Sequence, residues 1–470
     1  MSVRARRKKL QWGCVAMREQ CIFIDATSTF LYGGNSGIQR VTRNIVNHSP
    51  AVAAHIPCLI QPIVWTGFGF IGLPGSLDDQ SSAVLRFLPW RARRRRSHER
   101  VGRRSAASLA TRVAQRICRI VNWRHIQQSY ERIALFIVCF LSFPRLIASG
   151  RFISFRESDV VLLIDSTWNS TSMLDALASA QIRFSVYVAP MIHDLFPLTL
   201  PQTCEEETIR CYSWWFYRVI PKADFVVTNS KATQRALEAF IAASPGLRLR
   251  PLAIVPFRLG AELDLIRSPQ RRSTSPVELM NVPGVVLLSI GTIEPRKNIP
   301  YILDAFDHLR RRGADVSLVI VGRQGWKCDA VVNRISTHPE LGVRLLHYSN
   351  ASDSLLSSAI ERADCLVIAS IAEGFGLPVV EGLMRGLDVF ASDLEVFREI
   401  ANDYCCFFPL SDPELLADAI QRWTVARSTV STSVGRQPFA WVGWEHSTRE
   451  LMESVRALLK SGVLKQSDGV

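Results

Sequence analysis

The sequence lacks the cysteine spacing of a disulfide scaffold or a metal-binding module. Its 470 residues include 11 cysteines, yet it contains no C-x-x-C pair and no cluster of cysteine and histidine at the spacing of metal ligands. Cys405 and Cys406 are adjacent, and the others are scattered along the chain. Scattered cysteines are typical of reduced thiols that are mostly buried. We therefore expect a protein of the cytoplasm.

Long apolar runs are also missing. The longest one, residues 133–143, ends before Pro144 and is shorter than the roughly 20 residues that a membrane-spanning helix needs. The N-terminal residues carry charge but no apolar stretch of the length found in signal peptides. Met17 directly precedes the first convincing strand, so Met17 and Met1 both remain open as the start. These features predict a chain that does not cross the bilayer as a helix.

Acidic residues are scarce in two segments, and these segments account for the positive net charge of +14. Residues 86–132 contain 14 arginines, no lysine and only two acids, and residues 1–18 contain six basic residues and no acid. The rest of the chain is mildly acidic. We interpret residues 1–20 as a basic arm and residues 81–150 as an insertion in the first domain.

The second half of this insertion places isoleucine and valine among arginines in a pattern that fits a basic amphipathic helix. Such a helix can lie on an anionic membrane, which predicts peripheral binding to the inner face of the cytoplasmic membrane. A basic helix packed on its own domain is the competing interpretation. Nucleic-acid binding is disfavoured, because no recognised binding module accompanies the arginines.

A complete G-x-G-x-x-G motif is absent from the first strand-to-helix loop, which argues against a nicotinamide-dinucleotide site. What the chain does contain is an alternation of short apolar strands and amphipathic helices, in two series. This alternation predicts an α/β fold with two Rossmann-like halves. The predicted N-terminal domain, C-terminal domain and last helix cover residues 21–265, 283–440 and 441–470.

The stretch EGFGLPVVE, from Glu373 to Glu381, follows an apolar run that we predict to be a buried parallel strand. Gly374 and Gly376 allow the backbone to turn tightly and to approach a ligand closely. Pro378 suits the first turn of a helix, where its missing N–H is not needed. Free N–H groups at a helix start attract anions, and the two carboxylates suit the hydroxyls of a sugar. An ordinary strand-to-helix turn with two solvated glutamates is the alternative.

Two loops of the first series also follow predicted strands. Ser36 and Gly37 open a helix, and Arg40 adds positive charge to its first turns. His193 lies in the sequence MIHDLFP, just beyond a strand that we predict over residues 184–190, where open α/β sheets line their ligand crevice. Taken singly, each loop also fits a structural or solvated role.

A loop of the second series carries two neighbouring cations. Arg296 and Lys297 lie in GTIEPRKN, between a predicted strand and a predicted helix. Two cations beside a helix start would neutralise a diphosphate. This loop therefore predicts a phosphate site that faces the same edge of the sheet as Glu373.

Taken together and in order, these motifs resemble the GT-B glycosyltransferases of family GT4. The match is close over residues 285–400, where GTIEPRKN, VIASIAEGFGLPVVE and SDLEVFREI stand in the family's order and the two glutamates follow its E-x7-E pattern. It is looser over residues 21–47 and at MIHDLFP, and it is absent over residues 81–150. The resemblance implies that the two Rossmann-like domains face each other across a cleft, and that the last helix crosses back to the N-terminal domain.

The resemblance also implies a role for each matching residue. Glu373 would hold hydroxyls of the donor sugar, and Glu381 would hold the ribose of its nucleotide. Arg296 and Lys297 would bind the diphosphate and offset the charge of the leaving group. His193 would face the donor sugar. Backbone N–H groups would meet sugar and phosphate oxygens around Gly374, Phe375, Gly376 and Leu377.

From the opposite domain, Ser36 and Gly37 would close the phosphate site. Two residues depart from the family's pattern, since Thr292 replaces an arginine of many relatives and Asp388 replaces a usual proline. No D-x-D motif occurs, which argues against the metal-dependent GT-A type. We therefore expect no obligatory metal and no cofactor besides the nucleotide-sugar donor.

The resemblance predicts a retaining glycosyltransferase of surface polysaccharide biosynthesis, acting on a glycan or a polyprenyl-diphosphate-linked glycan. GTIEPRKN together with SGIQR is most similar to mannosyltransferases, so GDP-mannose is the preferred donor and a UDP- or dTDP-sugar is the alternative. A non-catalytic homologue that binds nucleotide sugars or membranes is a further alternative. The joint presence of His193, Arg296, Lys297, Glu373 and Glu381 argues against it.

Overall fold

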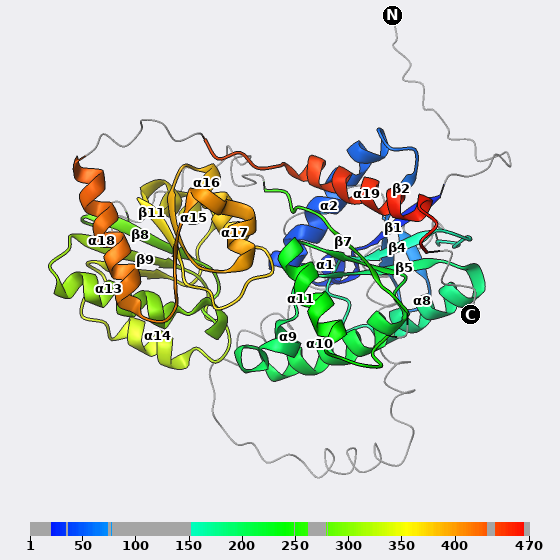
Figure 1. Cartoon of the computed structure of the whole chain (residues 1–470), viewed down its shortest axis with the longest axis horizontal. Helices are drawn as coiled ribbons and strands as arrows, with labels where there is room; N and C mark the ends of the chain where they lie inside the picture. The colour runs from blue at the N-terminus through cyan, green and yellow to red at the C-terminus, as the bar shows by residue number, and fades with distance from the viewer. Residues whose placement is uncertain are drawn as a thin grey trace, which may run out of the picture.

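In the computed structural model, helices and strands group around two β-sheets, one from each half of the chain (Figure 1). The predicted insertion at 81–150, and the predicted arm up to residue 19, lie outside the described residues. None of the helices within the described ranges combines the length and the hydropathy that crossing a bilayer requires. The structure describes residues 20–33, 36–73, 77, 152–248, 250–261, 279, 281–429 and 438–464.

The first sheet has seven strands in the order β3-β2-β1-β4-β5-β6-β7. Neighbouring strands are parallel except for the antiparallel pair β2 and β3. The central strands are buried along their length, as expected for a parallel sheet covered on both faces. Their bounds are β1 Cys21–Asp25, β2 Leu59–Trp65, β3 Phe70–Gly72, β4 Val160–Leu163, β5 Tyr187–Ile192, β6 Phe225–Thr228 and β7 Ala253–Pro256.

The second sheet has six parallel strands in the order β10-β9-β8-β11-β12-β13. In each sheet the chain begins at a central strand, adds strands toward one edge, and then adds the remaining strands on the other side of the first. As a result, β1 lies beside β4, and β8 lies beside β11. At such a switch point the carboxyl ends of the strands open a ligand crevice. The bounds are β8 Val285–Ile290, β9 Val316–Val321, β10 Leu345–Tyr348, β11 Cys365–Ile368, β12 Asp388–Ser392 and β13 Cys405–Phe408.

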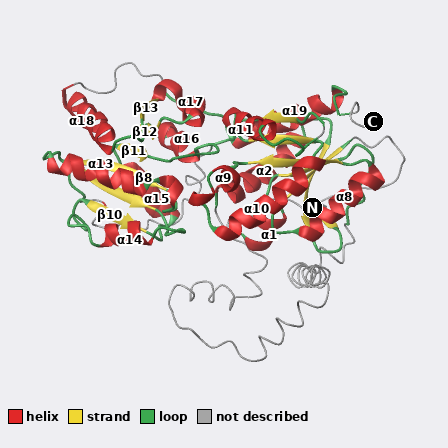
Figure 2. Cartoon of the chain, turned by 60° about the horizontal axis from the view of Figure 1, so that its bottom comes forward, coloured by secondary structure: helices red, strands yellow, loops and turns green. Residues whose placement is uncertain are grey.

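Helices pack against both sheets (Figure 2). We call the first sheet with its helices the N-terminal half, and the second sheet with its helices the C-terminal half. The helices of the N-terminal half are α1 Thr27–Tyr32, α2 Gly37–Ala53, α8 Thr171–Phe184, α9 Phe196–Thr199, α10 Glu206–Val219 and α11 Lys231–Ala242. Those of the C-terminal half are α13 Ile299–Arg311, α14 Asp329–Ser336, α15 Asp353–Arg362, α16 Leu377–Met384, α17 Glu395–Ala401 and α18 Pro413–Thr429.

The last helix, α19 Trp444–Lys460, packs on α2 of the N-terminal half (Figure 1). The segment before it forms hydrogen bonds to that half, because Trp441 Nε1 donates to the carbonyl of Leu259 at 2.7 Å and the Ala261 N–H donates to the carbonyl of Val442 at 3.0 Å. The Trp444 side chain is fully buried. The end of the chain thus connects the two halves a second time.

The predicted α/β class with two mostly parallel, helix-covered sheets is confirmed. Ser230 is the N-cap of α11, because its Oγ accepts from the Thr233 N–H at 3.0 Å. The strand predicted over residues 184–190 is wrong at its start. Phe184 ends α8, and Ser185 takes the left-handed conformation with φ of 50°, so β5 begins at Tyr187.

Close packing between Gly260 and the start of α19 gives a stability prediction. A Cβ atom on Gly260 would lie 2.6 Å from the Cα of Trp444, so Gly260→Ala forces α19 to shift. We expect a loss of about 1 to 3 kcal/mol in unfolding free energy, as for other overpacked sites. Thermal unfolding, monitored by circular dichroism, measures this loss in unfolding free energy. Gly37→Ala is the control, because its added methyl meets no atom within 4 Å; equal unfolding temperatures for the two variants would contradict the prediction.

Candidate functional site

A cluster of charged side chains lies beyond the carboxyl ends of β8 and β11, the switch point of the second sheet. Lys297 Nζ donates to Glu373 Oε1 at 2.5 Å, and Arg296 forms an ion pair with Glu373 Oε2 at 2.8 Å. Ser370 Oγ donates to the same carboxylate at 2.9 Å. The structure therefore brings together three of the predicted site residues, although Glu373 lies 76 positions after Lys297 in the sequence.

The two cations hold Glu373 in its charged form. Burial by itself raises the pKa of a carboxyl group, but Arg296 and Lys297 outweigh it and lower the pKa of Glu373 to about 2. The group is therefore an ionised acceptor at neutral pH. An ionised carboxylate is a strong acceptor for hydroxyl groups, so Glu373 is chemically suited to hold a sugar.

Arg296 has acidic neighbours in addition to Glu373. It pairs with Glu294 at 2.6 Å, donates to the carbonyl of Ala372 at 2.9 Å and lies over the ring of Phe196 at 5.3 Å. Burial disfavours the charged guanidinium, but Glu373 and Glu294 outweigh this effect and raise the pKa of Arg296. No role was predicted for Glu294, although it lies within GTIEPRKN two residues before Arg296.

The loop after β11 leads directly into α16, as predicted. Gly376 is the N-cap of α16, and its φ of 112° is a conformation that favours glycine. Pro378 lies in the first turn. The side chain of Phe375 is buried and packs edge-on against Trp441 at 5.9 Å. Leu377 is the first residue of α16, so the N-terminal N–H groups of the helix lie next to this loop.

Gly374 brings this loop against the N-terminal half. A Cβ atom on Gly374 would lie 2.1 Å from the carbonyl oxygen of His193, so only glycine fits there. The carbonyl of Gly374 accepts from Ser230 Oγ at 2.9 Å and from Thr233 Oγ1 at 3.1 Å. The two halves are therefore in direct contact at the predicted sugar site.

His193 lies just beyond β5 and is buried. Its Nε2 donates to the carbonyl of Ile164 at 2.9 Å, and its own carbonyl accepts from Asn229 Nδ2 at 3.0 Å. Burial lowers the pKa of His193 to about 4, although the hydrogen bond to Ile164 opposes the shift. The ring is thus neutral at physiological pH, and Nδ1 can accept a hydrogen bond.

Asp194 adds a carboxyl group from the N-terminal half to the same cluster. Burial raises the pKa of Asp194, while the charge of Arg296 opposes this shift. Tyr212 donates its hydroxyl to the Asp194 carbonyl at 2.6 Å, which fixes the backbone after His193. Asp194 directly follows His193 in MIHDLFP, but no role was predicted for it. Its proximity to Arg296 depends on how the two halves meet.

The remaining predicted residues lie on α2 and α16. Ser36 is the N-cap of α2, and it forms a capping box with Gln39. Gly37 is the first residue of α2 and has open space around it. One turn further on, Arg40 forms an ion pair with Glu381 of α16. The start of α2 therefore lies close to α16, and both helices contribute to one site.

Two buried carboxyl groups occupy the same edge of the first sheet without belonging to the cluster. Asp25 ends β1, and Asp165 follows β4. Asp165 accepts from the Thr29 N–H at 2.6 Å, and Asp25 accepts from the Thr27 N–H at 3.2 Å. Burial and the charge of Asp165 raise the pKa of Asp25 to about 7. Both groups cap the start of α1, which makes their role structural.

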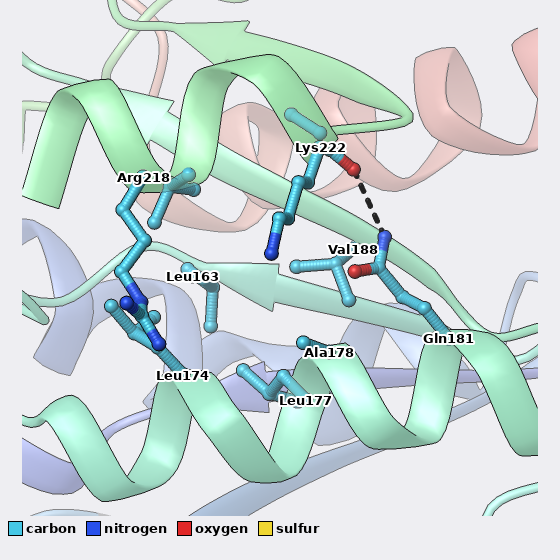
Figure 3. A pocket seen from close by; sticks show the side chains of 10 residues that line it. Leu163, Leu174, Leu177, Ala178, Gln181, Val188, Arg218 and Lys222 are labelled. Carbon is cyan, nitrogen blue, oxygen red and sulfur yellow. Dashed lines mark hydrogen bonds between the residues drawn. The ribbon is translucent and has the colours of Figure 1, made fainter.

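A hollow elsewhere on the N-terminal half contains none of the predicted site residues. It lies between α8 and α10 and is lined mainly by leucine, valine and alanine side chains below Arg218 and Lys222 (Figure 3). Gln181 Nε2 donates to the carbonyl of Lys222 at 3.0 Å across its rim. Over the described residues, no three histidine, cysteine or acidic side chains converge as metal ligands.

The environment of His193 yields a titration prediction. We expect the imidazole of His193 to take up a proton near pH 4, because burial disfavours its charged form. The ring should therefore stay neutral from pH 5 to pH 8. The pKa of His193 is measured by nuclear magnetic resonance, from the pH dependence of its Cε1–H signal. That signal is assigned as the one that disappears in His193→Gln. If His193 had a pKa near the ordinary histidine value of 6.5, its buried position would be contradicted.

Comparisons with known proteins agree with this geometry. Residues 271–428 match the family model described as glycosyl transferases group 1. The serotype-specific mannosyltransferase WbdA of Escherichia coli is 28% identical over 319 residues, which are 67% of this chain and 39% of that protein. The phosphatidyl-myo-inositol mannosyltransferase of Mycobacterium tuberculosis is 29% identical over 172 residues, 36% of this chain and 43% of that protein. This chain thus covers less than half the length of these relatives.

A solved structure shows the same fold over nearly the whole chain. Sucrose-phosphate synthase from Thermosynechococcus elongatus has a TM-score of 0.52 and 15% identity, with 96% of this chain and 98% of that chain covered. The family match includes Arg296, Lys297, Glu373 and Glu381. The family model, the relatives and the fold agree, and together they support a group 1 glycosyltransferase, family GT4, with the GT-B fold.

Proposed function

We propose that this chain is a retaining glycosyltransferase that transfers a sugar, preferably mannose, from a nucleotide-diphosphate donor in surface polysaccharide biosynthesis. The acceptor would be a glycan or a polyprenyl-diphosphate-linked glycan. The cluster of Arg296, Lys297 and Glu373 beside His193 is the observation that carries the proposal. GDP-mannose is the preferred donor, since several relatives are mannosyltransferases by name, and a UDP- or dTDP-sugar is the alternative.

The cluster can exchange its internal ion pairs for contacts to a donor. Arg296 and Lys297 would turn from Glu373 to the diphosphate and offset the negative charge that develops on the leaving group. Glu373, ionised at neutral pH, would accept from hydroxyls of the sugar. The N–H groups from Gly374 to Leu377 would meet sugar and phosphate oxygens at the start of α16. Ser36 and Gly37 would close the phosphate site from α2.

His193 would act as a neutral group beside the sugar. Its Nε2 is already bonded to Ile164, which leaves Nδ1 to accept from a donor hydroxyl or to face the positive anomeric centre. Retention of configuration would follow from front-face transfer, in which the departing phosphate assists deprotonation of the acceptor. Incubation with a mixture of nucleotide sugars tests the donor class, because it shows which nucleotide is released. A non-catalytic homologue would release none.

The charged cluster gives a prediction for activity. We expect Lys297→Ala and Glu373→Ala each to lower the transfer rate by about 100-fold or more, because each removes a group that acts on developing charge. Release of nucleoside diphosphate measures the rate, and circular dichroism checks the fold. Arg312→Ala is the control, since it breaks an ion pair with Asp418 outside the cluster. Near-normal rates in both cluster variants would refute the site.

The arginine-rich insertion gives a prediction for membrane binding, which rests on sequence alone. We expect replacement of the four arginines at 93–96 by glutamate to weaken co-sedimentation with vesicles containing phosphatidylglycerol, because each cation near an anionic surface contributes about 1 kcal/mol. Binding of the nucleotide donor should not change. Replacement of the same four residues by lysine keeps the charge and serves as the control. Unchanged sedimentation of the glutamate variant would reject the membrane role.

A further inference from the structure

We propose that Arg40 of α2 binds the phosphates of the nucleotide donor, and that Glu381 of α16 positions its guanidinium for this contact. This inference rests on the proposed function, since it concerns the same donor site. It adds a third cation to that site, supplied by the opposite half of the chain. The residues that carry it are Arg40, Glu381 and Arg385.

The first observation is the ion pair between Arg40 and Glu381. The two side chains are 23% and 18% exposed, so both are mostly shielded from water. They come from different halves and are 341 positions apart in the sequence. Arg40 lies three residues after Gly37, the first residue of α2, and Glu381 lies four residues after Leu377, the first residue of α16. The guanidinium is therefore about one turn from the N-terminal ends of two helices, the ends that favour anions.

The second observation is the charge balance of the main cluster. Arg296 and Lys297 face three carboxyl groups, those of Glu373, Glu294 and Asp194. Two cations opposed by three acids leave little charge to offset a diphosphate. Because the donor's phosphates carry negative charge, a further cation at the neighbouring helix starts would help to offset that charge.

Arg385 brings a second guanidinium group close to Glu381. It is the C-cap of α16, four residues after Glu381, and its charge interacts with both Glu381 and Arg40. Its Nη1 is buried and has no hydrogen-bond partner among the described residues. Two guanidinium groups, those of Arg40 and Arg385, thus lie near Glu381, and Glu361 is a second carboxylate beside Arg385. The buried Nη1 of Arg385 can donate to an anionic ligand.

The geometry allows Glu381 to serve two groups at once. The ion pair with Arg40 uses Oε1, and Oε2 can accept from a ribose hydroxyl. A guanidinium has five N–H donors in a planar fork, so one arginine can contact a carboxylate and a phosphate at the same time. Ribose and phosphate are neighbours in a nucleotide, which matches the order of these two side chains.

The alternative is that Arg40 only links the two halves. Arg235 provides a matched control for that role, because it also crosses from α11 of the N-terminal half to α17 of the C-terminal half. It pairs with Glu395 at 2.5 Å and with Glu399 at 3.9 Å. Arg235→Ala therefore removes a cross-half ion pair away from the predicted phosphate site, whereas Arg40→Ala removes one beside it.

The test is titration calorimetry of GDP, GMP and guanosine, with UDP and dTDP in parallel, into wild type, Arg40→Gln, Arg40→Lys and Arg235→Ala. We expect Arg40→Gln to weaken binding of the phosphorylated ligands by about 10-fold or more, since a charge-assisted hydrogen bond is lost. Arg40→Lys should restore part of the affinity, because it keeps the charge but not the fork. Guanosine binding, measured by competition, should not change, and Arg235→Ala should bind GDP like wild type. Circular dichroism of each variant confirms its fold.

Other results would overturn either the role of Arg40 alone or the proposed function as well. If wild type binds GDP, UDP or dTDP and Arg40→Gln binds it equally well, the role of Arg40 is overturned while the proposed function stands. If Arg40→Gln and Arg235→Ala weaken binding equally, or if guanosine is weakened as much as GDP, Arg40 is a link between the halves and not a phosphate ligand. If wild type binds none of the nucleoside diphosphates, the proposed function falls and the role of Arg40 falls with it.

Discussion

A buried carboxylate held between two cations is the interaction on which this site depends. Glu373 would be costly to bury as an isolated charge, because a buried ion loses its hydration. Arg296, Lys297 and Ser370 compensate this loss with three direct contacts. The same contacts keep the loop after β11 in place at the start of α16. A donor would therefore meet both cations and the carboxylate in one place, and would replace the ion pairs between them.

The glycine that follows Glu373 couples this cluster to the rest of the molecule. Because Gly374 has no side chain, the loop lies directly on the backbone of His193, and its carbonyl accepts from Ser230 and Thr233. Close contact between the halves also places Asp194 near Arg296. The cluster thus combines groups from two sheets that are each folded around their own switch point.

Contacts away from the cluster stabilise the same arrangement of the halves. Glu399 of α17 accepts from the Lys231 and Ala232 N–H groups, both at 2.8 Å, and so caps α11 of the other half. The segment before α19 packs Trp441 on Phe375 and then leads α19 onto α2. Because Trp441 anchors Phe375, the segment that leads to α19 supports the loop after β11 as well as contacting the N-terminal half.

The sequence by itself determined the class of fold, most strand positions and the loops that carry the candidate residues. Apolar runs such as β6 and β9 are recognisable because parallel strands are buried on both faces. Short elements were less readable: β13 is a four-residue edge strand, and the aromatic residues around Phe184 resemble a strand although they end α8. The tertiary structure alone decided which side chains meet. Arg40 and Glu381, or Asp194 and Arg296, pair only because two sheets pack together, and local sequence carries no information on contacts between residues so far apart in the chain.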